Sequence, residues 1–407
     1  MAESNSISRV FICCNDPYPF GTANSNYIRN LSLLTTACGY ETHVIGLKEY
    51  TVEPTNARYD TGIFEGVKFT NIQQKKSNLP FRMKNHFFFG KKLQKILNQY
   101  SVNDSDCIIL YTDFISASKF LLKKYRNLNE KGHLIYCIVE WFQAHQFSMS
   151  FLSLDYLCWK IHFDRYMPKY RKIIPISSNL AAHFKKFGVE TCILPCLVDC
   201  NVVKSGRKSI KHDAVIDLIY PGAATNKDDL ESMIKGLMLL PDNELHRIRL
   251  HFTTMNEEKL KKTCHCNSTE YERIKTSLFY HGWMERDELL RLYEDMDFLF
   301  IARQNNIITR SNFPSKVPEM LCYGTIPLCS DVGDYTTYYL EDMVNSLIFE
   351  GSTPAKCAEA IKRALNLEPS KIVEMKVGAR KCAEQQFDYR NWTVQMKNFL
   401  ESINEDK

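Results

Sequence analysis

Residues 8–46 decide the fold of the chain, and they read SRVFICCNDPYPFGTANSNYIRNLSLLTTACGYETHVIG. The apolar run 8–14 is rich in β-branched and aromatic side chains and leads into a turn, which predicts a buried strand. Residues 24–38 have apolar side chains at helical spacing and stop at Gly39, and residues 42–46 predict the next strand. Strand, helix and strand in this order form a βαβ unit, so we expect a parallel sheet with right-handed crossovers.

The same alternation continues along the chain. Further strands are predicted at residues 107–111, 133–139, 172–176 and 191–194, with helices at 116–125 and 178–187. Residues 202–213 are polar and basic without periodicity, and we interpret them as a linker. Beyond it we expect strands at 214–220, 248–253, 278–282, 297–301 and 325–329, with helices at 230–240, 287–294, 316–323 and 355–366. The predicted fold class is α/β, with two Rossmann-like doubly wound domains.

Composition and charge exclude several classes of protein. The 407 residues are 44% hydrophobic and 24% charged, as in a soluble globular chain. Apolar runs such as 298–302 are far shorter than the roughly 18 residues that span a bilayer. Residues 1–15 lack the basic and apolar regions of a secretory signal, so a cytoplasmic location is expected. A net charge of +5 is too small for a dedicated nucleic-acid binder, and no nucleic-acid partner is expected.

Residues 66–103 form a basic, aromatic stretch without a single Asp or Glu. Its cations are Lys68, Lys75, Lys76, Arg82, Lys84, Lys91, Lys92 and Lys95, and its aromatic side chains are Phe81, Phe87, Phe88, Phe89 and Tyr100. Such a mixture suits a surface that meets anionic lipid headgroups or a phosphorylated acceptor, which would place the protein peripherally on the inner face of the cell membrane. The alternative is a solvated loop and helix whose Phe side chains face the core.

Fifteen cysteines are scattered through the chain without a CxxC pair. Cys264, His265 and Cys266, with His281 nearby, match the ligand spacing of no common zinc module. We therefore expect reduced thiols that behave as small apolar residues, and no metal site.

Two loops of the second predicted domain carry candidate binding residues. In open α/β sheets, ligands bind beyond the carboxyl ends of the strands. Residues 220–230 place Gly222 and Lys227 ahead of a helix, although an ordinary loop with a surface lysine would look the same. Residues 302–319 add three cations and a hydroxyl near a helix N-terminus, namely Arg303, Arg310, Lys316 and Ser315. Such groups favour the binding of phosphate oxygens.

Glu319 lies three residues after Lys316, on the same face of the predicted helix. Its carboxylate can accept hydrogen bonds from a pair of sugar hydroxyls, while the neighbouring cations suit a diphosphate. A nucleotide diphosphate joined to a sugar offers both groups. The alternative interpretation of Glu319 is a capping or solvated carboxylate.

Residues 312–328, NFPSKVPEMLCYGTIPL, resemble the donor-binding motif of the family-four retaining glycosyltransferases, which have the two-domain GT-B fold. The resemblance is closest to the bacterial capsule and lipopolysaccharide branch with its Phe-Pro-Ser/Thr-Lys variant. Residues 280–297, YHGWMERDELLRLYEDMD, are similar to another segment of the family. The resemblance spans nearly the whole chain and is most specific over residues 280–335.

The resemblance implies an acceptor-binding domain at residues 1–205 and a sugar-nucleotide-binding domain at 206–385, facing each other across a cleft. Residues 386–407 would form a helix that packs back toward the N-terminal domain. Glu319 would bind the ribose hydroxyls, and Lys227 the diphosphate. The further donor-binding residues would be Gly21, Gly222, Arg303, Arg310, Ser315 and Lys316. Glu140 falls where the family keeps a polar residue near the reacting centre, so Glu140 and Glu319 are the predicted catalytic residues.

The chain also departs from the family pattern. Ser311 stands eight positions before Glu319, where the family has a first glutamate that touches the donor sugar. Ala223 and Ala224 stand where an arginine often follows the glycine of the first donor loop. We hypothesise that Arg303 or Arg310 compensates for this missing arginine.

The implied activity is retaining transfer of a hexose from a nucleotide diphosphate sugar to a hydroxyl of a glycan or lipid-linked acceptor, in surface polysaccharide biosynthesis. No cofactor is expected besides this co-substrate, and the base would be the leaving phosphate, Glu140 or Asp113. A catalytically impaired GT-B-like scaffold is the alternative that Ser311 and Ala223 leave open. An NAD-dependent oxidoreductase is disfavoured because residues 21–26, GTANSN, are not the G-x-G-x-x-G fingerprint.

Overall fold

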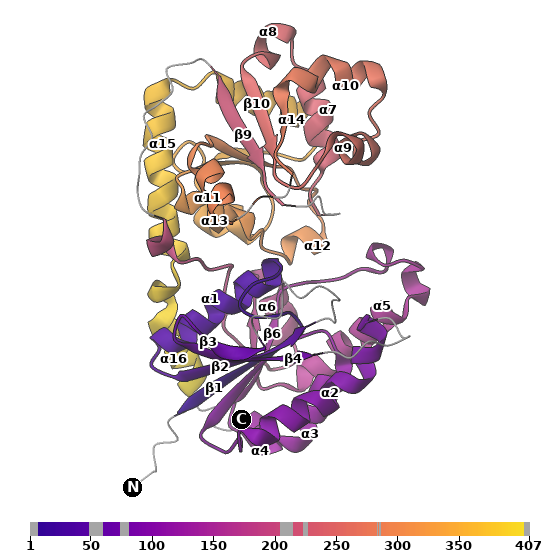
Figure 1. Ribbon diagram of the computed structural model, residues 1–407, viewed down its shortest axis with the longest axis vertical. Coiled ribbons are helices and arrows are strands. Elements are labelled where there is room, and N and C mark those ends of the chain that lie inside the picture. The colour runs from indigo at the N-terminus through magenta and orange to yellow at the C-terminus, as the bar shows by residue number, and fades with distance from the viewer. Residues whose placement is uncertain are drawn as a thin grey trace. The chain divides into compact units, whose positions relative to one another are not determined.

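The computed structural model describes residues 7–48, 60–73, 81–203, 215–222, 227–282, 284 and 286–402 (Figure 1). The chain divides into two compact units. Unit 1 is Met1–Leu197 with Tyr389–Lys407, and unit 2 is Val198–Asp388. Most of the predicted linker, with the boundary expected near residue 205, lies in 204–214 and is outside the described residues.

Unit 1 is built on a sheet that has eight strands among the described residues, in the order β3-β4-β2-β1-β5-β6-β7-β8. The strands are β1 (Arg9–Cys14), β2 (Glu41–Lys48), β3 (Thr61–Phe64), β4 (Val67–Gln73), β5 (Asp106–Tyr111), β6 (Leu134–Ile138), β7 (Lys172–Pro175) and β8 (Glu190–Thr191). Strand β1 lies in the middle, where Ile12 pairs with Val44 of β2 and Ile109 of β5 in parallel register. Its apolar run is buried because helices cover both faces of a parallel sheet.

The α-helices of unit 1 connect these strands. They are α1 (Ala23–Ala37), α2 (Phe81–Gln99), α3 (Ile115–Lys124), α4 (Arg126–Glu130), α5 (Leu154–Ile161), α6 (Ser178–Lys185) and, from the end of the chain, α16 (Thr393–Glu401). Helix α1 begins where it does because Thr22 caps it. The Thr22 side chain accepts a hydrogen bond from the backbone N–H of Asn24, and the Ser25 hydroxyl oxygen accepts one from the backbone N–H of Thr22. The short helices are η2 (Ala144–Gln146), η3 (Ser150–Leu152), η4 (His162–Tyr166), η5 (Met167–Lys169) and η10 (Tyr389–Trp392).

Unit 2 has an all-parallel sheet in the order β11-β10-β9-β12-β13-β14, counted over its described residues. The strands are β9 (Ile216–Tyr220), β10 (Ile248–Phe252), β11 (Leu278–Tyr280), β12 (Phe298–Ile301), β13 (Ile326–Ser330) and β14 (Leu347–Phe349). Its core lies between the sheet and the helices, with Leu218 and Phe300 fully buried. Helices α7 and α14 approach closely at Gly236, where a Cβ would stand 2.6 Å from that of Cys357.

The helices of unit 2 follow the strands in alternation. The α-helices are α7 (Leu230–Met238), α8 (Asp242–Leu245), α9 (Glu257–Thr263), α10 (Ser268–Ile274), α11 (Arg286–Glu294), α12 (Ile307–Arg310), α13 (Lys316–Cys322), α14 (Pro354–Leu365) and α15 (Pro369–Cys382). The short helices are η6 (Cys200–Val202), η7 (Lys275–Ser277), η8 (Tyr335–Tyr339) and η9 (Ala383–Phe387).

Each unit has one point in its sheet where the strand order reverses. In unit 1 the chain winds outward in opposite directions from β1 and β5, and in unit 2 from β9 and β12. The loops that follow two such strands separate and leave a crevice at the carboxyl edge, which is where doubly wound sheets bind ligands. The fold therefore indicates where a site in each unit should be sought.

The predicted fold class is confirmed, because both units contain a largely parallel sheet with helical connections. The strand expected at 191–194 is shorter than predicted: β8 ends at Thr191. Strands β3 and β4 were not predicted. They form an antiparallel hairpin whose turn places Glu65 and Gly66 in the left-handed region, and the hairpin extends an otherwise parallel sheet.

Helices of the described ranges fall short of what a bilayer span requires in length and apolar character. All fifteen cysteines are free thiols, and all but Cys266 are buried.

Candidate functional site

The predicted donor-binding residues of unit 2 gather at the β9/β12 switch point. Gly222 and Lys227 follow β9, while Arg303 and Arg310 follow its neighbour β12. The same long loop ends at α13, whose first turn carries the remaining three residues, Ser315, Lys316 and Glu319. The predicted residues of this unit therefore come together at one edge of one sheet. Ala223 and Ala224 lie outside the described residues.

A buried carboxylate, which the sequence did not single out, organises this edge. Asp228 accepts hydrogen bonds from Arg303 Nε at 2.8 Å, from Lys316 Nζ at 2.8 Å and from the Tyr220 hydroxyl at 2.7 Å. Burial alone raises the pKa of Asp228, but the charges of Arg303 and Lys316 outweigh it and hold the pKa well below its ordinary value. Two cations and one carboxylate leave this cluster with one net positive charge.

Arg303 lies inside unit 2, with its side chain only 4% exposed. Its Nη1 donates to Asn312 Oδ1 at 3.0 Å, besides the bond of its Nε to Asp228. Burial lowers the pKa of Arg303, but the charge of Asp228, its hydrogen bond and the nearby Tyr335 and Tyr220 together raise the pKa above its ordinary value, so the guanidinium stays charged. Arg303 thus joins the β12 loop to the segment that precedes α13, and its direct contact with a phosphate stays a prediction.

Lys316 is more accessible, and its ammonium lies over the ring of Tyr220, 3.8 Å from the ring centroid. Burial lowers the pKa of Lys316, and the charge of Asp228 opposes that shift. Gly222 has a φ of +78°, and a Cβ built there would stand 4.0 Å from Lys316 Cε. Its N–H donates to Thr253 Oγ1 at 2.8 Å, so in this structure Gly222 fixes the loop.

The other predicted residues of unit 2 differ in exposure. Glu319, Ser315 and Lys227 are half-buried, and Arg310, at the end of α12, is exposed. Ser311 is completely buried, so the position where the family pattern has its first glutamate belongs to the interior of unit 2 here. Lys227 and Arg310 add further positive charge to the edge that holds the Asp228 cluster.

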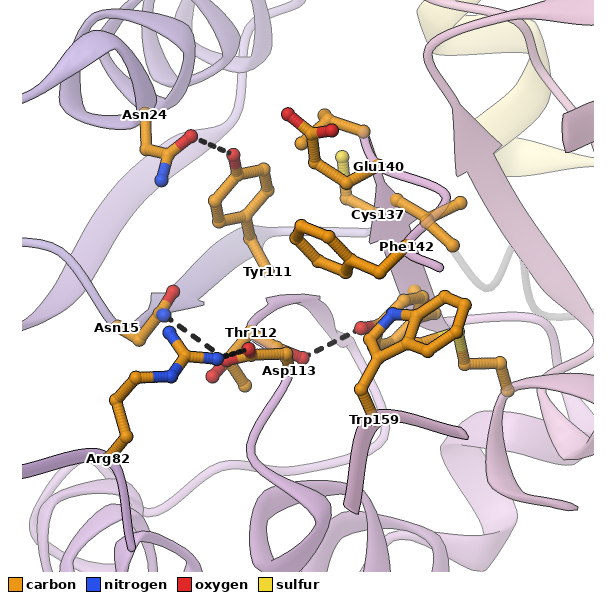
Figure 2. Close-up of a pocket in the computed structure, with 14 residues that line it drawn as sticks. Asn15, Asn24, Arg82, Tyr111, Thr112, Asp113, Cys137, Glu140, Phe142 and Trp159 are labelled. Atoms are coloured by element: carbon orange, nitrogen blue, oxygen red, sulfur yellow. Dashed lines mark hydrogen bonds and ion pairs between the residues drawn. The ribbon is translucent and has the colours of Figure 1, made fainter. Parts of the chain in front are cut away.

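Unit 1 has a pocket of about 160 Å³ at its own switch point between β1 and β5 (Figure 2). Its lining comes from the ends of β5 and β6, from the loops after β1, β5 and β6, and from α1, α2, α5 and η5. It comprises Asn15, Asn24, Arg82, Tyr111, Thr112, Asp113, Tyr136, Cys137, Ile138, Val139, Glu140, Phe142, Trp159 and Met167. The predicted residue Glu140 and the alternative base Asp113 therefore share one pocket.

Asp113 is held from two sides in this pocket. Asn15 Nδ2 donates to its carboxylate at 3.4 Å, and Arg82 forms an ion pair with it (Figure 2). Nearby, the Tyr111 hydroxyl donates to Asn24 Oδ1 at 2.8 Å. The pocket thus combines carboxylates and amides, which can form hydrogen bonds with a polar ligand, with aromatic rings, which can pack against its apolar faces.

Gly21 is not among the lining residues of this pocket, although its loop contributes Asn15 and the helix that follows, α1, contributes Asn24. A Cβ at Gly21 would stand 2.6 Å from the Ser25 hydroxyl oxygen, which accepts the backbone N–H of Thr22, the residue that caps α1. Gly21 therefore allows the loop after β1 to close onto the start of α1. The role of Gly21 in donor binding stays a prediction.

Sequence reasoning overlooked Asp228, Asn15, Asn24 and Trp159. A usable signal existed for Asn15, because it directly follows the buried strand β1 and polar residues at that position cluster at the carboxyl edge of a parallel sheet. Trp159 comes from α5, a helix that the sequence pattern did not predict. Within the described residues, no cluster of three or more His, Cys, Asp or Glu side chains is arranged to hold a metal ion.

Residues 205–381 match the family model described as glycosyl transferases group 1, a range that covers most of unit 2. No curated protein matches the chain. Among solved structures, the chain is similar to the trehalose-6-phosphate structure from E. coli bound with UDP-2-fluoro glucose, at 12% identity and a TM-score of 0.70, covering 97% of this chain and 99% of that one.

Two further structures are similar over the whole chain. Anabaena HepE, in complex with UDP and glucose, has 14% identity and a TM-score of 0.67, covering 97% of this chain and 100% of HepE. WaaG, described as a glycosyltransferase involved in lipopolysaccharide biosynthesis, has 15% identity and a TM-score of 0.64, covering 98% of this chain and 100% of WaaG. At these identities the likeness establishes the fold, which is the predicted GT-B fold.

Proposed function

We propose that the chain transfers a hexose from a nucleotide diphosphate sugar to a hydroxyl group, with retention of anomeric configuration; the match of residues 205–381 to the family model of group 1 glycosyl transferases supports this proposal. The observation that carries the proposal is the positive edge at the β9/β12 switch point. There Lys316 reaches Asp228 from α13, and Glu319 follows one turn later on the same helix. A diphosphate and a ribose are the two groups that such an arrangement recognises.

We assign the donor to unit 2. Lys316, Lys227 and Arg310 would meet the diphosphate, and Glu319 would accept hydrogen bonds from the ribose hydroxyls. Asp228 would hold the ammonium of Lys316 in position, and Arg303 would fix the β12 loop through its hydrogen bonds to Asp228 and Asn312. HepE and the E. coli relative were solved with UDP ligands, so UDP-glucose is the first donor to test.

The reaction needs charge stabilisation and a proton acceptor. The bond from the anomeric carbon to the diphosphate oxygen breaks, a bond from that carbon to the acceptor oxygen forms, and the acceptor proton leaves. Fixed cations stabilise the charge that develops on the diphosphate more than they stabilise the substrate. The proton passes to the leaving phosphate, with Glu140 and Asp113 of unit 1 as the alternative bases.

We assign the acceptor to the pocket of unit 1, as a glycan or a lipid-linked saccharide. Carboxylates at Asp113 and Glu140 would bind its hydroxyls, and Trp159 and Phe142 would cover its apolar faces. A role in surface polysaccharide biosynthesis is consistent with the likeness to WaaG.

Release of nucleotide diphosphate from a panel of sugar nucleotides, with saccharide acceptors present, tests the proposal. The wild-type chain should consume one donor class. Glu319→Ala should lose most of that turnover, whereas Glu359→Ala, at an exposed ion pair on α14, should keep it. Consumption of no donor by the wild-type chain would favour the scaffold function over the enzyme.

A further inference from the structure

Unit 1 exposes a group of large apolar side chains within thirteen consecutive residues. We call this group the apolar face; it comprises Met149, Phe151, Leu152, Leu154, Leu157 and Ile161. The exposed fractions of Met149, Phe151 and Leu152 are 73%, 71% and 76%. Single exposed apolar residues are ordinary on a protein surface, but a contiguous group of this size marks an interaction surface.

The apolar face includes one side of helix α5. Leu154, Leu157 and Ile161 recur at intervals of three and four residues, so they lie along one side of the helix, and all three are exposed. The other side is buried through Cys158 and Trp159, and Trp159 lines the pocket of unit 1. Helix α5 therefore separates an apolar surface from the candidate acceptor site.

The neighbouring helix α2 brings positive charge beside this surface. Asp155 of α5 joins the helices, because it pairs with Arg82 Nε at 3.3 Å and with His86 Nε2 at 3.2 Å. The outer side of α2, at helical spacing, presents aromatic and basic residues, namely Lys84, Phe87, Phe88, Lys91 and Lys95. Phe89, Leu93 and Leu97 form its buried side.

The acidic residues near the apolar face are paired. Asp155 is paired with Arg82 and His86, and Asp164, beyond the end of α5, pairs with Lys160 at 2.7 Å. Helix α2 itself contains no acidic residue. The local excess of charge is therefore positive, and it flanks exposed apolar side chains rather than mixing with acidic ones.

We propose that the apolar face, flanked by the lysines of α2, docks on an anionic phospholipid bilayer. Met149, Phe151, Leu152 and the outer side of α5 would enter the boundary between headgroups and acyl chains, while the lysines contact lipid phosphates. Docking would hold the helix that carries Trp159 at the membrane surface, where a lipid-linked acceptor resides. That last step rests on the proposed function, whereas lipid binding itself does not.

Co-sedimentation with phosphatidylcholine vesicles, with and without phosphatidylglycerol, tests the proposal on the full chain. The wild-type chain should bind the vesicles that contain phosphatidylglycerol, and added salt should weaken binding because it screens the lysines. Phe151→Ser combined with Leu152→Ser should lower the partition coefficient by about tenfold or more, since two apolar insertions are lost. Lys91→Gln combined with Lys95→Gln should lower it by roughly fivefold per lysine.

Val394→Ser is the matched control, because Val394 is equally exposed, at 71%, but lies on α16. Thermal unfolding and nucleotide stabilisation should be unchanged in all of these variants, so a failure of lipid binding is separable from a failure of the donor site. Wild-type chain that stays unbound, or serine variants that bind as the wild type does, would overturn the proposal. So would a wild-type dimer that Phe151→Ser and Leu152→Ser convert to a monomer without any vesicle binding.

Discussion

Asp228 is the residue on which the geometry of the unit 2 site depends most. Its carboxylate is almost fully buried and binds two cations that come from different parts of the chain, Arg303 after β12 and Lys316 at the start of α13. The sequence could not predict that Asp228 contacts Arg303 and Lys316, because this contact exists only where β9 and β12 lie next to each other in the sheet. The sequence motif did indicate the cations and Glu319.

Replacement of this carboxylate should be costly. Asp228→Asn leaves the charged guanidinium of Arg303 buried without a counter-charge, which should lower the free energy of unfolding by about 3–5 kcal/mol. Urea unfolding measures this loss. Glu359→Ala, which removes an exposed ion pair with Lys356, should leave the free energy of unfolding nearly unchanged, because solvent screens such a pair. Equal effects of the two variants would contradict the organising role of Asp228.

His162 links stability to pH. It is fully buried, its Nε2 lies 2.7 Å from the Ser118 hydroxyl, and burial lowers its pKa to about 4. The unfolded chain, with the ordinary pKa near 6.5, takes up the proton first. Stability should therefore fall as pH drops from about 6.5 to 4, by an amount on the order of 3 kcal/mol for this residue.

Chemical unfolding at several pH values measures this dependence. His162→Gln should make the decline between pH 6.5 and 4 smaller without removing it, because burial also lowers the pKa of His43 to about 4. His145→Gln, at an exposed position, should leave the decline as in the wild type. A decline of the same size in both variants would assign the pH dependence to other groups.

At the scale of elements, periodic and strongly apolar segments could be predicted, and irregular ones could not. Strand β1 and helix α1 lie within one or two residues of their predicted bounds, because a continuous apolar run and a helical stripe leave little ambiguity. Helix α5 has apolar residues on its exposed side as well as its buried side, so its sequence lacks the expected pattern. Phe89 of the basic stretch faces the core, as the alternative interpretation expects, whereas Phe87 and Phe88 are exposed. Contact of this stretch with lipid or with a phosphorylated acceptor stays a prediction.

The C-terminal end of helix α16 is held to the sheet of unit 1 by one buried lysine, Lys172. Lys172 of β7 donates from Nζ to the carbonyl oxygens of Phe399 and Ser402, both at 2.6 Å, and so satisfies the C-terminal end of the helix. Lys172→Met should leave these carbonyls without a donor, a loss of about 1–3 kcal/mol. Amide exchange in residues 393–401 should then be roughly 5- to 150-fold faster. Lys381→Met, at an exposed position, is the control, and unchanged exchange in Lys172→Met would contradict the anchoring role.

At the scale of the whole molecule, the two units share one sheet architecture but carry different side chains at its carboxyl edge. Each places its candidate site at the switch point of a doubly wound sheet, cationic in unit 2 and lined by carboxylates and aromatic rings in unit 1. The family resemblance led to the unit 2 site through a contiguous motif. The unit 1 pocket could be predicted only through Glu140 and Asp113, because its lining is assembled from loops and helices far apart in the sequence.

If the donor binds to unit 2 and the acceptor to unit 1, as proposed, a change in the unit 1 pocket should affect turnover but not nucleotide binding. Glu140→Gln distinguishes the two proton acceptors: transfer should slow by about 100-fold or more if Glu140 is the base, and by much less if the leaving phosphate is, while nucleotide binding to unit 2 is unchanged in both cases. Glu130→Gln, at an exposed ion pair of α4, should leave both quantities unchanged. Steady-state kinetics together with a binding assay separate the two effects. Loss of nucleotide binding in Glu140→Gln would contradict the assignment of donor and acceptor to different units.

A thermal-unfolding screen of nucleotide diphosphate sugars tests whether such a ligand binds at the β9/β12 edge of unit 2, as we propose. One nucleotide, present at 100 times its dissociation constant, should stabilise the wild-type chain by about 2.7 kcal/mol. That gain should be absent in Glu319→Ala and retained in Glu359→Ala. Stabilisation by none of the nucleotides, or equal stabilisation of Glu319→Ala and the wild type, would contradict the claim.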